Sequence, residues 1–200
     1  MTIHLIKMLN KVCAPQVATL RYLSAILLLW AAAMTVQAQS PVVAASEKVE
    51  LDRYLGVWYE IARKPTNLEK KCARDVTASY TLNEYSNMLI EHRCFDENNQ
   101  PIKLLGEGYA VNEPWYSKFK LSFLPETIRW LPIAQHDYWI LKFDSDYQMV
   151  LVGAPDRRHL WVLARQSHPD PELLKLYLAH AKSLGYDLKN LIYTPHQISP

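Results

Sequence analysis

The chain has 200 residues, which is enough for one ordinary domain with a substantial core. Half of the residues are hydrophobic and only 5 are glycine, a composition that excludes disordered and collagen-like chains. The formal net charge is only +2 and no block of Lys or Arg stands out, so we expect no nucleic-acid partner.

The first 38 residues have the pattern of an export signal. Lys7 and Lys11 precede an apolar run over residues 22–34, and Val36-Gln37-Ala38 supplies small residues suited to signal peptidase. The alternative is a membrane anchor, although the run is short for a span of about 20 residues. No cysteine lies directly after the run, so the sequence predicts no lipid anchor. Residues 39–48 are expected to form a flexible tether before a domain over residues 49–200.

Export implies an oxidising compartment, in which cysteines tend to pair. Cys13 lies in the segment expected to be removed, which leaves Cys72 and Cys94. These two flank a predicted hairpin over residues 76–94, centred at residue 83 if they pair. We expect a structural disulfide, with two free thiols as the alternative.

Alternating apolar and polar residues predict strands along most of the remaining chain. The first covers residues 55–62, where Trp58, Glu60 and Ala62 share one face. The other predicted strands cover residues 76–82, 88–94, 103–111, 117–123, 138–143, 149–153 and 160–165. Asp170 as N-cap and Gly185 as terminator predict one helix over residues 170–184, followed by a short strand over 191–194. Eight strands with short connections predict an all-β, eight-stranded up-and-down antiparallel barrel with one C-terminal helix packed outside.

Two features suggest how such a barrel would end. Trp58 is large and flat enough to close one end, and an indole attracts a cation across its face, for which Arg165 is the candidate. The loop over residues 124–136 is unusually apolar, with Ile128, Trp130 and Ile133. It either folds onto its own barrel or contacts a membrane or partner.

Three signatures occur in order: Gly56-x-Trp58-Tyr59, Asp146-Tyr147 and Arg165. Together they resemble the lipocalins, specifically the bacterial lipocalins similar to apolipoprotein D. The resemblance implies a barrel that carries a small hydrophobic molecule, in the bacterial branch a fatty acid or lysophospholipid. Because bacterial relatives often carry a lipid anchor that is not predicted here, we expect a periplasmic or secreted protein, with association with the outer membrane as the alternative.

Parity along the strands, together with the resemblance, predicts which side chains face the barrel interior. Besides Ala62, Gly108 and Leu163, the expected ligand contacts are Glu60, Ala78, Tyr80, Ile90, His92, Ala110, Phe119, Leu121, Phe123, Tyr138, Ile140, His159 and Trp161. Most are apolar or aromatic, which suits an alkyl chain, although a fully packed barrel is the alternative. Glu60, Tyr80, His92, Tyr138 and His159 are candidates for fixing a polar head, while each histidine could equally be structural.

We expect no catalysis, cofactor or metal. The sequence contains no hydrolase, metalloprotease or phosphate-binding motif, and His92, His136 and His159 lack metal-ligand spacing. The alternative is a lipid isomerase or de-epoxidase on the same scaffold, with His92, Glu60 or Tyr138 as the reactive group. The expected partners are a small hydrophobic ligand and, through residues 124–136, a membrane surface; the expected assembly is a monomer or weak homodimer.

Overall fold

The computed structural model describes residues 42–46 and 48–197. The expected export signal, its cleavage site and Cys13 lie outside the described residues. Within the part described, none of the helices has the length and apolar character needed to cross a bilayer.

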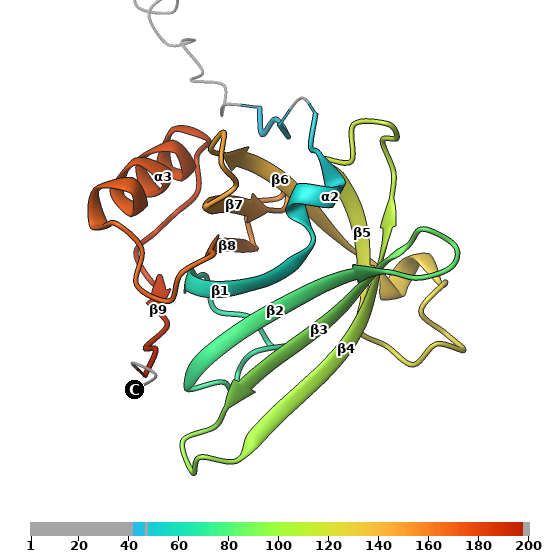
Figure 1. Ribbon diagram of the computed structural model, residues 1–200, viewed down its shortest axis with the longest axis horizontal. Helices are drawn as coiled ribbons and strands as arrows, with labels where there is room; N and C mark the ends of the chain where they lie inside the picture. Colours follow the sequence, from blue (N-terminus) through green and yellow to red (C-terminus); the bar gives the residue numbers. More distant parts are fainter. Residues whose placement is uncertain (1–41, 47, 198–200) are drawn as a thin grey trace, which may run out of the picture. The chain divides into compact units, whose positions relative to one another are not determined.

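One antiparallel sheet forms the body of the protein (Figure 1). Its strands are β1 (Gly56–Arg63), β2 (Arg74–Leu82), β3 (Met88–Phe95), β4 (Pro101–Ala110), β5 (Lys118–Ser122), β6 (His136–Phe143), β7 (Met149–Gly153), β8 (Leu160–Ala164) and β9 (Ile192–Tyr193). Each of β1 to β8 pairs with its sequence neighbours, and β1 also pairs with β8. The first eight strands therefore close into a barrel, as predicted, and β9 pairs outside with the end of β1.

The helices are α2 (Leu51–Tyr54), the 3-10 turn η1 (Pro132–Ala134) and α3 (Pro171–Ser183). The predicted N-cap forms, since the Asp170 carboxylate accepts a hydrogen bond from the backbone N–H of Glu172. Figure 1 shows α3 beside β7 and β8, outside the barrel. Tyr177 and Ala181 are the buried residues of this helix, and the Tyr177 hydroxyl donates to the Met149 carbonyl at 3.0 Å.

Two apolar clusters result from this arrangement, one inside the barrel and one between the barrel and α3. β7 separates them, because Val150 and Val152 face the interior while Met149 and Leu151 face the helix. All five residues of β7 are buried, which explains its uninterrupted apolar sequence.

The segment before the barrel is partly packed against it. Val43 is buried in the cluster beneath α3, and the Ser46 backbone N–H donates to the Ile140 carbonyl at 2.7 Å. This part of the expected tether therefore contacts the folded domain.

The disulfide between Cys72 and Cys94 is confirmed, with a Cα–Cα distance of 5.5 Å. The hairpin centre predicted from it was wrong. Tyr80 lies opposite Ile90, which centres the hairpin at residue 85, and a register shift separates Arg74 from the regular part of the ladder. Cys72 precedes β2, so the bridge joins a loop to the end of β3 and does not report the hairpin register.

Candidate ligand-binding cavity

The barrel contains a cavity of about 1050 Å³, at the upper end of the range usual for ligand pockets, about 300–1,000 Å³. The interior is therefore not fully packed. The residues expected to contact a ligand that do line it are Glu60, Ala78, Tyr80, Ile90, His92, Leu121, Phe123, Tyr138, His159 and Trp161.

Three expected contacts lie elsewhere. Ala110, Phe119 and Ile140 do not line the cavity but belong to the apolar cluster around Trp58. They face the interior, as the alternation predicted. They lie nearer the closed end, however, where side chains fill the barrel. Alternation along a strand identifies the inward face and carries no information about depth.

Trp58 and Arg165 close this filled end. The Arg165 guanidinium carbon lies 3.8 Å from the centroid of a Trp58 ring, and the indole N–H donates to the Tyr54 carbonyl at 2.7 Å. Arg165 also donates to the carbonyls of residues 53, 54, 55 and 57. The arginine therefore holds the last turn of α2 and the start of β1 in addition to stacking on the indole.

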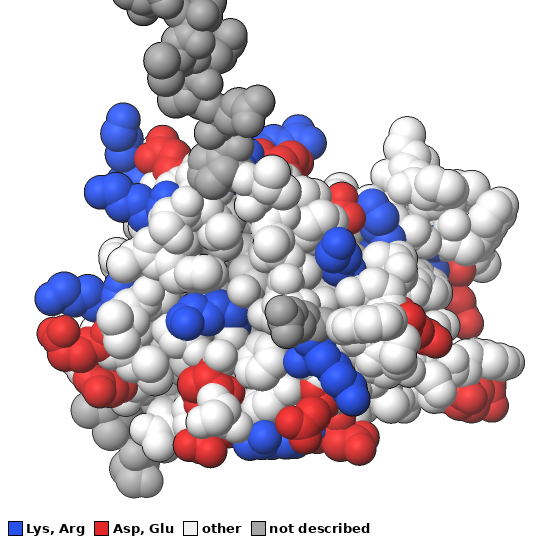
Figure 2. Space-filling view, turned by 90° about the horizontal axis from the view of Figure 1, so that it is seen from above, with Lys and Arg blue, Asp and Glu red and all other residues white. Residues whose placement is uncertain are grey.

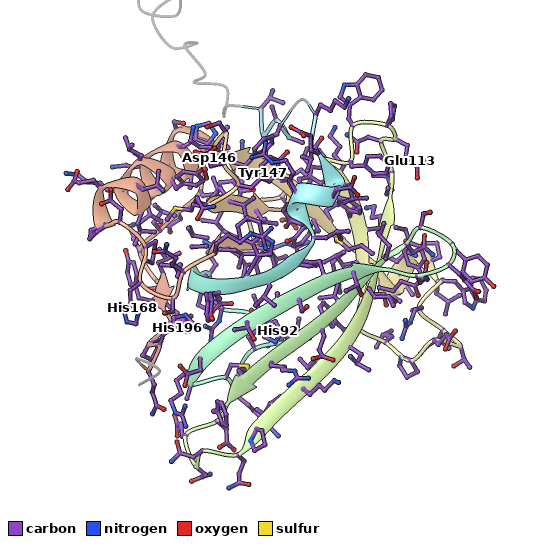
Figure 3. All side chains as sticks on the ribbon, in the orientation of Figure 1. His92, Glu113, Asp146, Tyr147, His168 and His196 are labelled. Atoms are coloured by element: carbon purple, nitrogen blue, oxygen red, sulfur yellow. A yellow bond between two sulfur atoms is a disulfide. The ribbon has the colours of Figure 1, made fainter. Side chains whose placement is uncertain are left out.

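The other signature residues shape the same end. Gly56 has φ +95°, which a side chain would strain. Tyr147 accepts a hydrogen bond from the Glu50 backbone N–H at 2.8 Å, and Figure 3 shows it with Asp146 at the turn between β6 and β7. Asp146 is exposed, whereas the carboxylate that holds this turn belongs to Asp144, which accepts from three backbone N–H groups. Tyr59 faces outward and packs toward α3.

A bulge in β1 corrects one of the predicted inward positions. Between Glu60 and Ala62, β1 advances two residues while β8 advances one. Trp58 and Glu60 face the interior as predicted, but Ala62 packs in the cluster beneath α3. Arg63 takes the inward place, where it is 4% exposed. The prediction for Ala62 was wrong because strict alternation does not survive an inserted residue.

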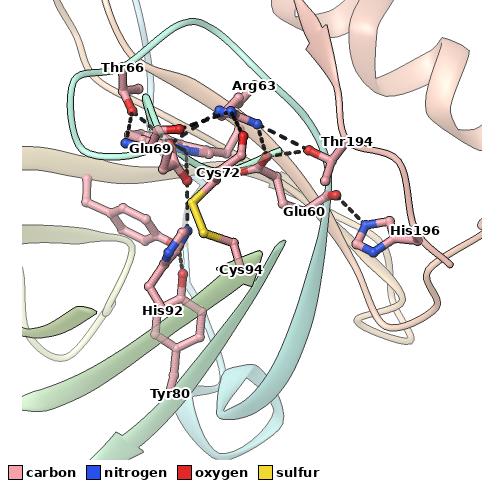
Figure 4. Close-up of polar contacts among 12 residues, drawn as sticks. Glu60, Arg63, Thr66, Glu69, Cys72, Tyr80, His92, Cys94, Thr194 and His196 are labelled. Carbon is pink, nitrogen blue, oxygen red and sulfur yellow. Dashed lines mark hydrogen bonds and ion pairs between the residues drawn. A yellow bond between two sulfur atoms is a disulfide. The ribbon is translucent and has the colours of Figure 1, made fainter. Parts of the chain in front are cut away.

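Arg63 and Glu60 form a buried pair (Figure 4). The Arg63 Nη1 donates to the Glu60 Oε1 at 2.7 Å, and Nη2 donates to the carbonyls of Glu69 and Cys72. The same Glu60 oxygen accepts from the Thr194 hydroxyl, in the segment that follows β9. Glu60 thus has the donor that its burial requires, while its second oxygen, Oε2, has no partner.

Glu69 enters the cavity from the loop between β1 and β2 and is only 2% exposed. Its carboxylate accepts from His92 Nε2 at 2.9 Å, from Trp161 Nε1 at 3.0 Å and from the Thr66 hydroxyl at 2.9 Å, as Figure 4 shows for His92 and Thr66. The Arg63 Nε lies 3.7 Å from it. The disulfide at Cys72, three residues later, attaches this loop to β3.

Sequence reasoning missed Arg63 and Glu69. Thr66-x-x-Glu69 is the pattern of a capping box, and the Glu69 backbone N–H does donate to the Thr66 hydroxyl at 3.2 Å. That pattern predicts a tight turn and gives no sign that the carboxylate enters the barrel. Val76, Leu68, Ile133 and Ala134 also line the cavity, the last three from loops at its mouth.

The two buried carboxyls titrate in opposite directions. Burial and the neighbouring Glu69 charge raise the pKa of Glu60 well above its usual value, against the opposing effect of Arg63. Burial acts against ionisation of Glu69 too, but the hydrogen bond and charge of His92, with the Trp161 N–H, outweigh it and lower the pKa of Glu69 to about 2. Of the two carboxyls beside Arg63, Glu69 is therefore the stronger acid.

Glu60, Glu69 and His92 also approach closely enough to share a metal ion, with one ligand atom from each within 4.8 Å of the others. The histidines considered from sequence were a different set. In this cluster the Arg63 guanidinium already supplies a positive charge against Glu60. We therefore interpret the three side chains as an ion-pair network that attaches the loop to the barrel wall.

Three tyrosine hydroxyls meet near the deep end of the cavity. The Tyr138 hydroxyl lies 2.5 Å from that of Tyr54 and 2.8 Å from that of Tyr80. Tyr80 and Tyr138 line the cavity, whereas Tyr54, from α2, does not and is 0% exposed. Burial raises the pKa of Tyr80 to about 12 and those of the other two well above their usual value, so all three hydroxyls stay protonated.

The loop over residues 124–136 borders the mouth of the cavity. It is attached through Arg129, which pairs with Glu107 on β4 at 3.0 Å, and Ala134 is buried. Trp130 and Ile133 nevertheless remain 66% and 91% exposed. The loop thus folds back on the barrel in part, and contact of its exposed apolar tip with a membrane or partner stays a prediction.

The outer surface has no dominant charge on the face shown in Figure 2, where Lys and Arg are interspersed with Asp and Glu. At the mouth, Lys70, His136, Arg158 and His159 line the cavity beside Asp137. Burial and the neighbouring His136 and Arg158 lower the pKa of His159, while Asp156 opposes the shift.

A model of the lipocalin-like domain matches residues 49–196. Temperature-induced lipocalin-1 of Arabidopsis thaliana is 32% identical over 154 residues, which cover 76% of this chain and 82% of that protein. The outer membrane lipoprotein Blc of Escherichia coli (strain K12) is 28% identical over 168 residues, which cover 82% of this chain and 90% of that protein.

Among solved structures, insecticyanin from the tobacco hornworm Manduca sexta superposes with a TM-score of 0.59 at 18% identity. The match covers 78% of this chain and 85% of that chain, and it shows the fold alone. The family model covers nearly all of the barrel and α3, and the relatives include bacterial lipocalins, as the sequence signatures indicated. The chain belongs to the lipocalin family, whose members bind small hydrophobic ligands.

Proposed function

We propose that this protein binds a lipid with one long hydrocarbon chain, a fatty acid or lysophospholipid, and carries or stores it in the bacterial cell envelope. The single observation that supports this is the cavity of about 1050 Å³. Its walls combine apolar side chains, such as Ile90 and Leu121, with a few polar groups, which is the composition of a site for an amphiphile.

The polar groups favour one orientation of an ionised ligand. The donors around Glu69, among them His92 and Trp161, already hold that carboxylate, so they are not free to bind an anionic head. Lys70, Arg158 and His136 line the mouth instead. We infer that a fatty acid enters with its hydrocarbon chain first and keeps its carboxylate at the mouth.

The envelope location rests on two supports. The disulfide indicates an oxidising compartment, and the similar Blc protein is an outer membrane lipoprotein. We propose export through the segment over residues 1–38 and a periplasmic or secreted product. The absence of a titratable thiol in the exported protein would agree with this, whereas reactive Cys72 or Cys94 would contradict it.

The exposed tip of the mouth loop supports peripheral contact with a membrane. Trp130 and Ile133 are the side chains that would enter a bilayer surface, since both are apolar and more than half exposed. Replacing both with serine should reduce binding to anionic phospholipid vesicles and leave lipid uptake unchanged. Leu176→Ser is the matched control, because Leu176 is 63% exposed on α3. Equal vesicle binding by both variants would remove the loop from the proposal.

Uptake of a fluorescent fatty acid tests the cavity directly. Ile90→Trp places an indole in the cavity wall and should reduce uptake at least tenfold, because the added volume occupies the space of the chain. Leu105→Trp is the matched control, on the exposed face of β4. Uptake that is unchanged in Ile90→Trp, with the fold intact by circular dichroism, would contradict the proposal.

We propose a binding protein and not an enzyme. Both cysteines of the described chain are in the disulfide, which leaves this part of the molecule without a thiol nucleophile. His92 and Glu60 are engaged in the ion-pair network. Assembly as a monomer or weak homodimer remains a prediction, which sedimentation at two concentrations would test.

A further inference from the structure

Two histidines lie side by side at the mouth of the cavity. His136 begins β6 and His159 directly precedes β8, and both line the cavity. The centroids of their rings are 6.2 Å apart. Because a hydrogen bond from an imidazole to an anion is about 2.8 Å long, both rings can donate to one acidic group placed between them.

The fold fixes the orientation of the His159 ring. The ring stacks on Trp161, with centroids 5.9 Å apart and planes 12° apart, and the Trp161 indole N–H donates to Glu69. The Nδ1 atom of His159 is buried and has no hydrogen-bond partner among the described residues. The other nitrogen, Nε2, makes no hydrogen bond in this part of the chain either, but it is not buried. Nε2 is therefore the nitrogen that a ligand can reach.

Most of the charged groups around this histidine pair already have partners. On the elements packed around it, these groups are Lys120, Asp137, Asp156, Arg158, Glu69 and Lys70. Asp137 pairs with Lys120 at 2.8 Å, and Asp156 pairs with Arg158 at 2.6 Å. Glu69 accepts from His92 and Trp161. Lys70 lines the mouth and, within the described residues, forms no hydrogen bond or ion pair.

An anion between the rings would change their protonation. Burial lowers the pKa of His159, and the neighbouring His136 and Arg158 add to this shift. Asp156 and Glu69 oppose it. A bound negative group stabilises the protonated form of both rings and offsets the repulsion between them, so it raises their pKa values. Binding of an anion therefore takes up protons, and its affinity increases as the pH falls through the range in which histidines titrate.

We propose that His136 and His159, together with Lys70, bind the acidic head of the lipid at the cavity mouth, and that mild acidification strengthens this binding. The inference rests on the proposed function and deepens it, since it assigns the residues that hold the head and the condition that regulates them. The ligand class is a single-chain lipid with a carboxylate or phosphate head. An uncharged lipid with the same chain should bind with the same affinity at every pH.

The test compares a charged and an uncharged ligand at two pH values. Tetradecanesulfonate keeps its negative charge throughout the range, whereas tetradecanol has none. Each displaces the uncharged fluorescent probe N-phenyl-1-naphthylamine from the protein. The sulfonate should bind the parent protein about fivefold more tightly at about pH 5.5 than at about pH 7.5, and tetradecanol should bind equally at both.

The variant His136→Gln/His159→Gln removes both titrating groups and should bind the sulfonate equally at the two pH values. His168→Gln is the matched control, because His168 is exposed and does not line the cavity. This control should keep the full pH dependence. Glu60 also lines the cavity and has a raised pKa, so its ionisation is the rival source of a pH effect. A pH dependence that persists in the double variant would assign it to Glu60 and overturn the histidine site.

Two further outcomes keep the proposals separate. If both ligands displace the probe from the parent protein but neither depends on pH, the histidine site is overturned and the proposed function stands. If neither ligand displaces the probe at either pH, the proposed function itself is overturned.

A second measurement needs no variant. Titration calorimetry of tetradecanesulfonate at about pH 6.5, in two buffers with different ionisation enthalpies, counts the protons exchanged on binding. The parent protein should take up protons with the sulfonate and none with tetradecanol. The absence of proton uptake with the sulfonate would overturn the proposal even if the double variant failed to fold.

Discussion

The two ends of the barrel are built on different principles. At the closed end, Trp58, Arg165 and the last turn of α2 interact through backbone carbonyls and stacked rings, and apolar side chains fill the remaining space. On the wall toward the open end, Arg63, Glu69 and their partners form a buried polar network inside an otherwise apolar lining. Packing closes the first end, whereas charged groups attach a loop to the wall near the second.

The difference shows where the stability of the fold depends on individual side chains. Loss of one apolar contact at the closed end leaves many others in place. In the polar network each charge compensates another, so removal of one leaves its partner buried and unpaired. We therefore expect the largest effects of conservative substitutions on the wall, even though the closed end carries the recognisable signature. The predictions below run from the largest expected effect to the smallest.

Glu69→Gln should destabilise the protein by about 3–4 kcal/mol. It removes the carboxylate that accepts from His92 and Trp161 and leaves Glu60 as the one carboxyl beside Arg63 among the described residues. The free energy of unfolding in urea measures the effect. A loss below about 1 kcal/mol would mean that the network contributes little and that the loop is attached by the disulfide alone.

Replacing Cys72 and Cys94 together with alanine should cost about 3 kcal/mol, because the bridge closes a loop whose ends are 22 residues apart in sequence. The loop that carries Glu69 would lose its covalent attachment to β3. Hydrogen exchange of the amides of residues 64–73 should increase more than that of β7. Uniform exchange changes would contradict the separate attachment of this loop.

Arg165→Lys should cost about 2 kcal/mol. Lysine keeps the charge over Trp58 but has one nitrogen where the guanidinium serves four carbonyls, so the end of α2 loses part of its hydrogen bonding. Ligand uptake should be unchanged, because Arg165 does not line the cavity. A matching loss of uptake would show that the two ends are coupled.

Acidification should distinguish the contribution of the polar network to stability from that of the closed end. The pKa of Glu69 is lowered from 4.5 to about 2 in the folded state, so its stabilisation is complete above about pH 5 and is lost as the pH falls toward 2. At roughly pH 3.5 the loss should be about 1–2 kcal/mol, and Glu69→Gln should not show it. The same slope in that variant would assign the pH dependence to other groups.

Glu60→Gln should have the smallest effect, below about 1 kcal/mol, at about pH 4. The pKa of Glu60 is raised above 4.5 in the folded state, so most of this carboxyl is neutral at about pH 4, and an amide is then a close substitute for it. Because the pKa is raised in the folded state, the parent protein should lose stability relative to the variant as the pH rises above 4.5, the ordinary pKa of a glutamate side chain. A loss as large as that of Glu69→Gln would show that Glu60 is ionised.

Much of the fold could be read from local patterns. The strands came from alternation, α3 from Asp170 and its apolar stripe, and the closed end from the signatures at Trp58 and Arg165. These features depend on residues that are near each other in sequence, or on large side chains whose type alone indicates a structural role. Cavity residues that lie on regularly alternating strands and away from the closed end, such as Ile90 and Tyr138, were also predicted.

The errors have three physical sources. Ala62 was misplaced because a bulge reverses parity after Glu60, and no local signal marks the extra residue. Alternation shows which face of a strand is inward but not how far along the barrel axis a residue lies. This is why the cavity lining was predicted to include Ala110, Phe119 and Ile140. Glu69 was missed because a loop carboxylate is ordinarily exposed, and only the fold places donors around it.

Local sequence therefore determined which segments are strands, which end is closed and that the chain resembles the lipocalins. Only the tertiary structure decided how deep the cavity is, which polar groups share it and which of them are charged. The physical reason is that backbone pairing follows short-range periodicity, whereas the pKa shifts of Glu60 and Glu69 depend on side chains brought together from distant parts of the chain.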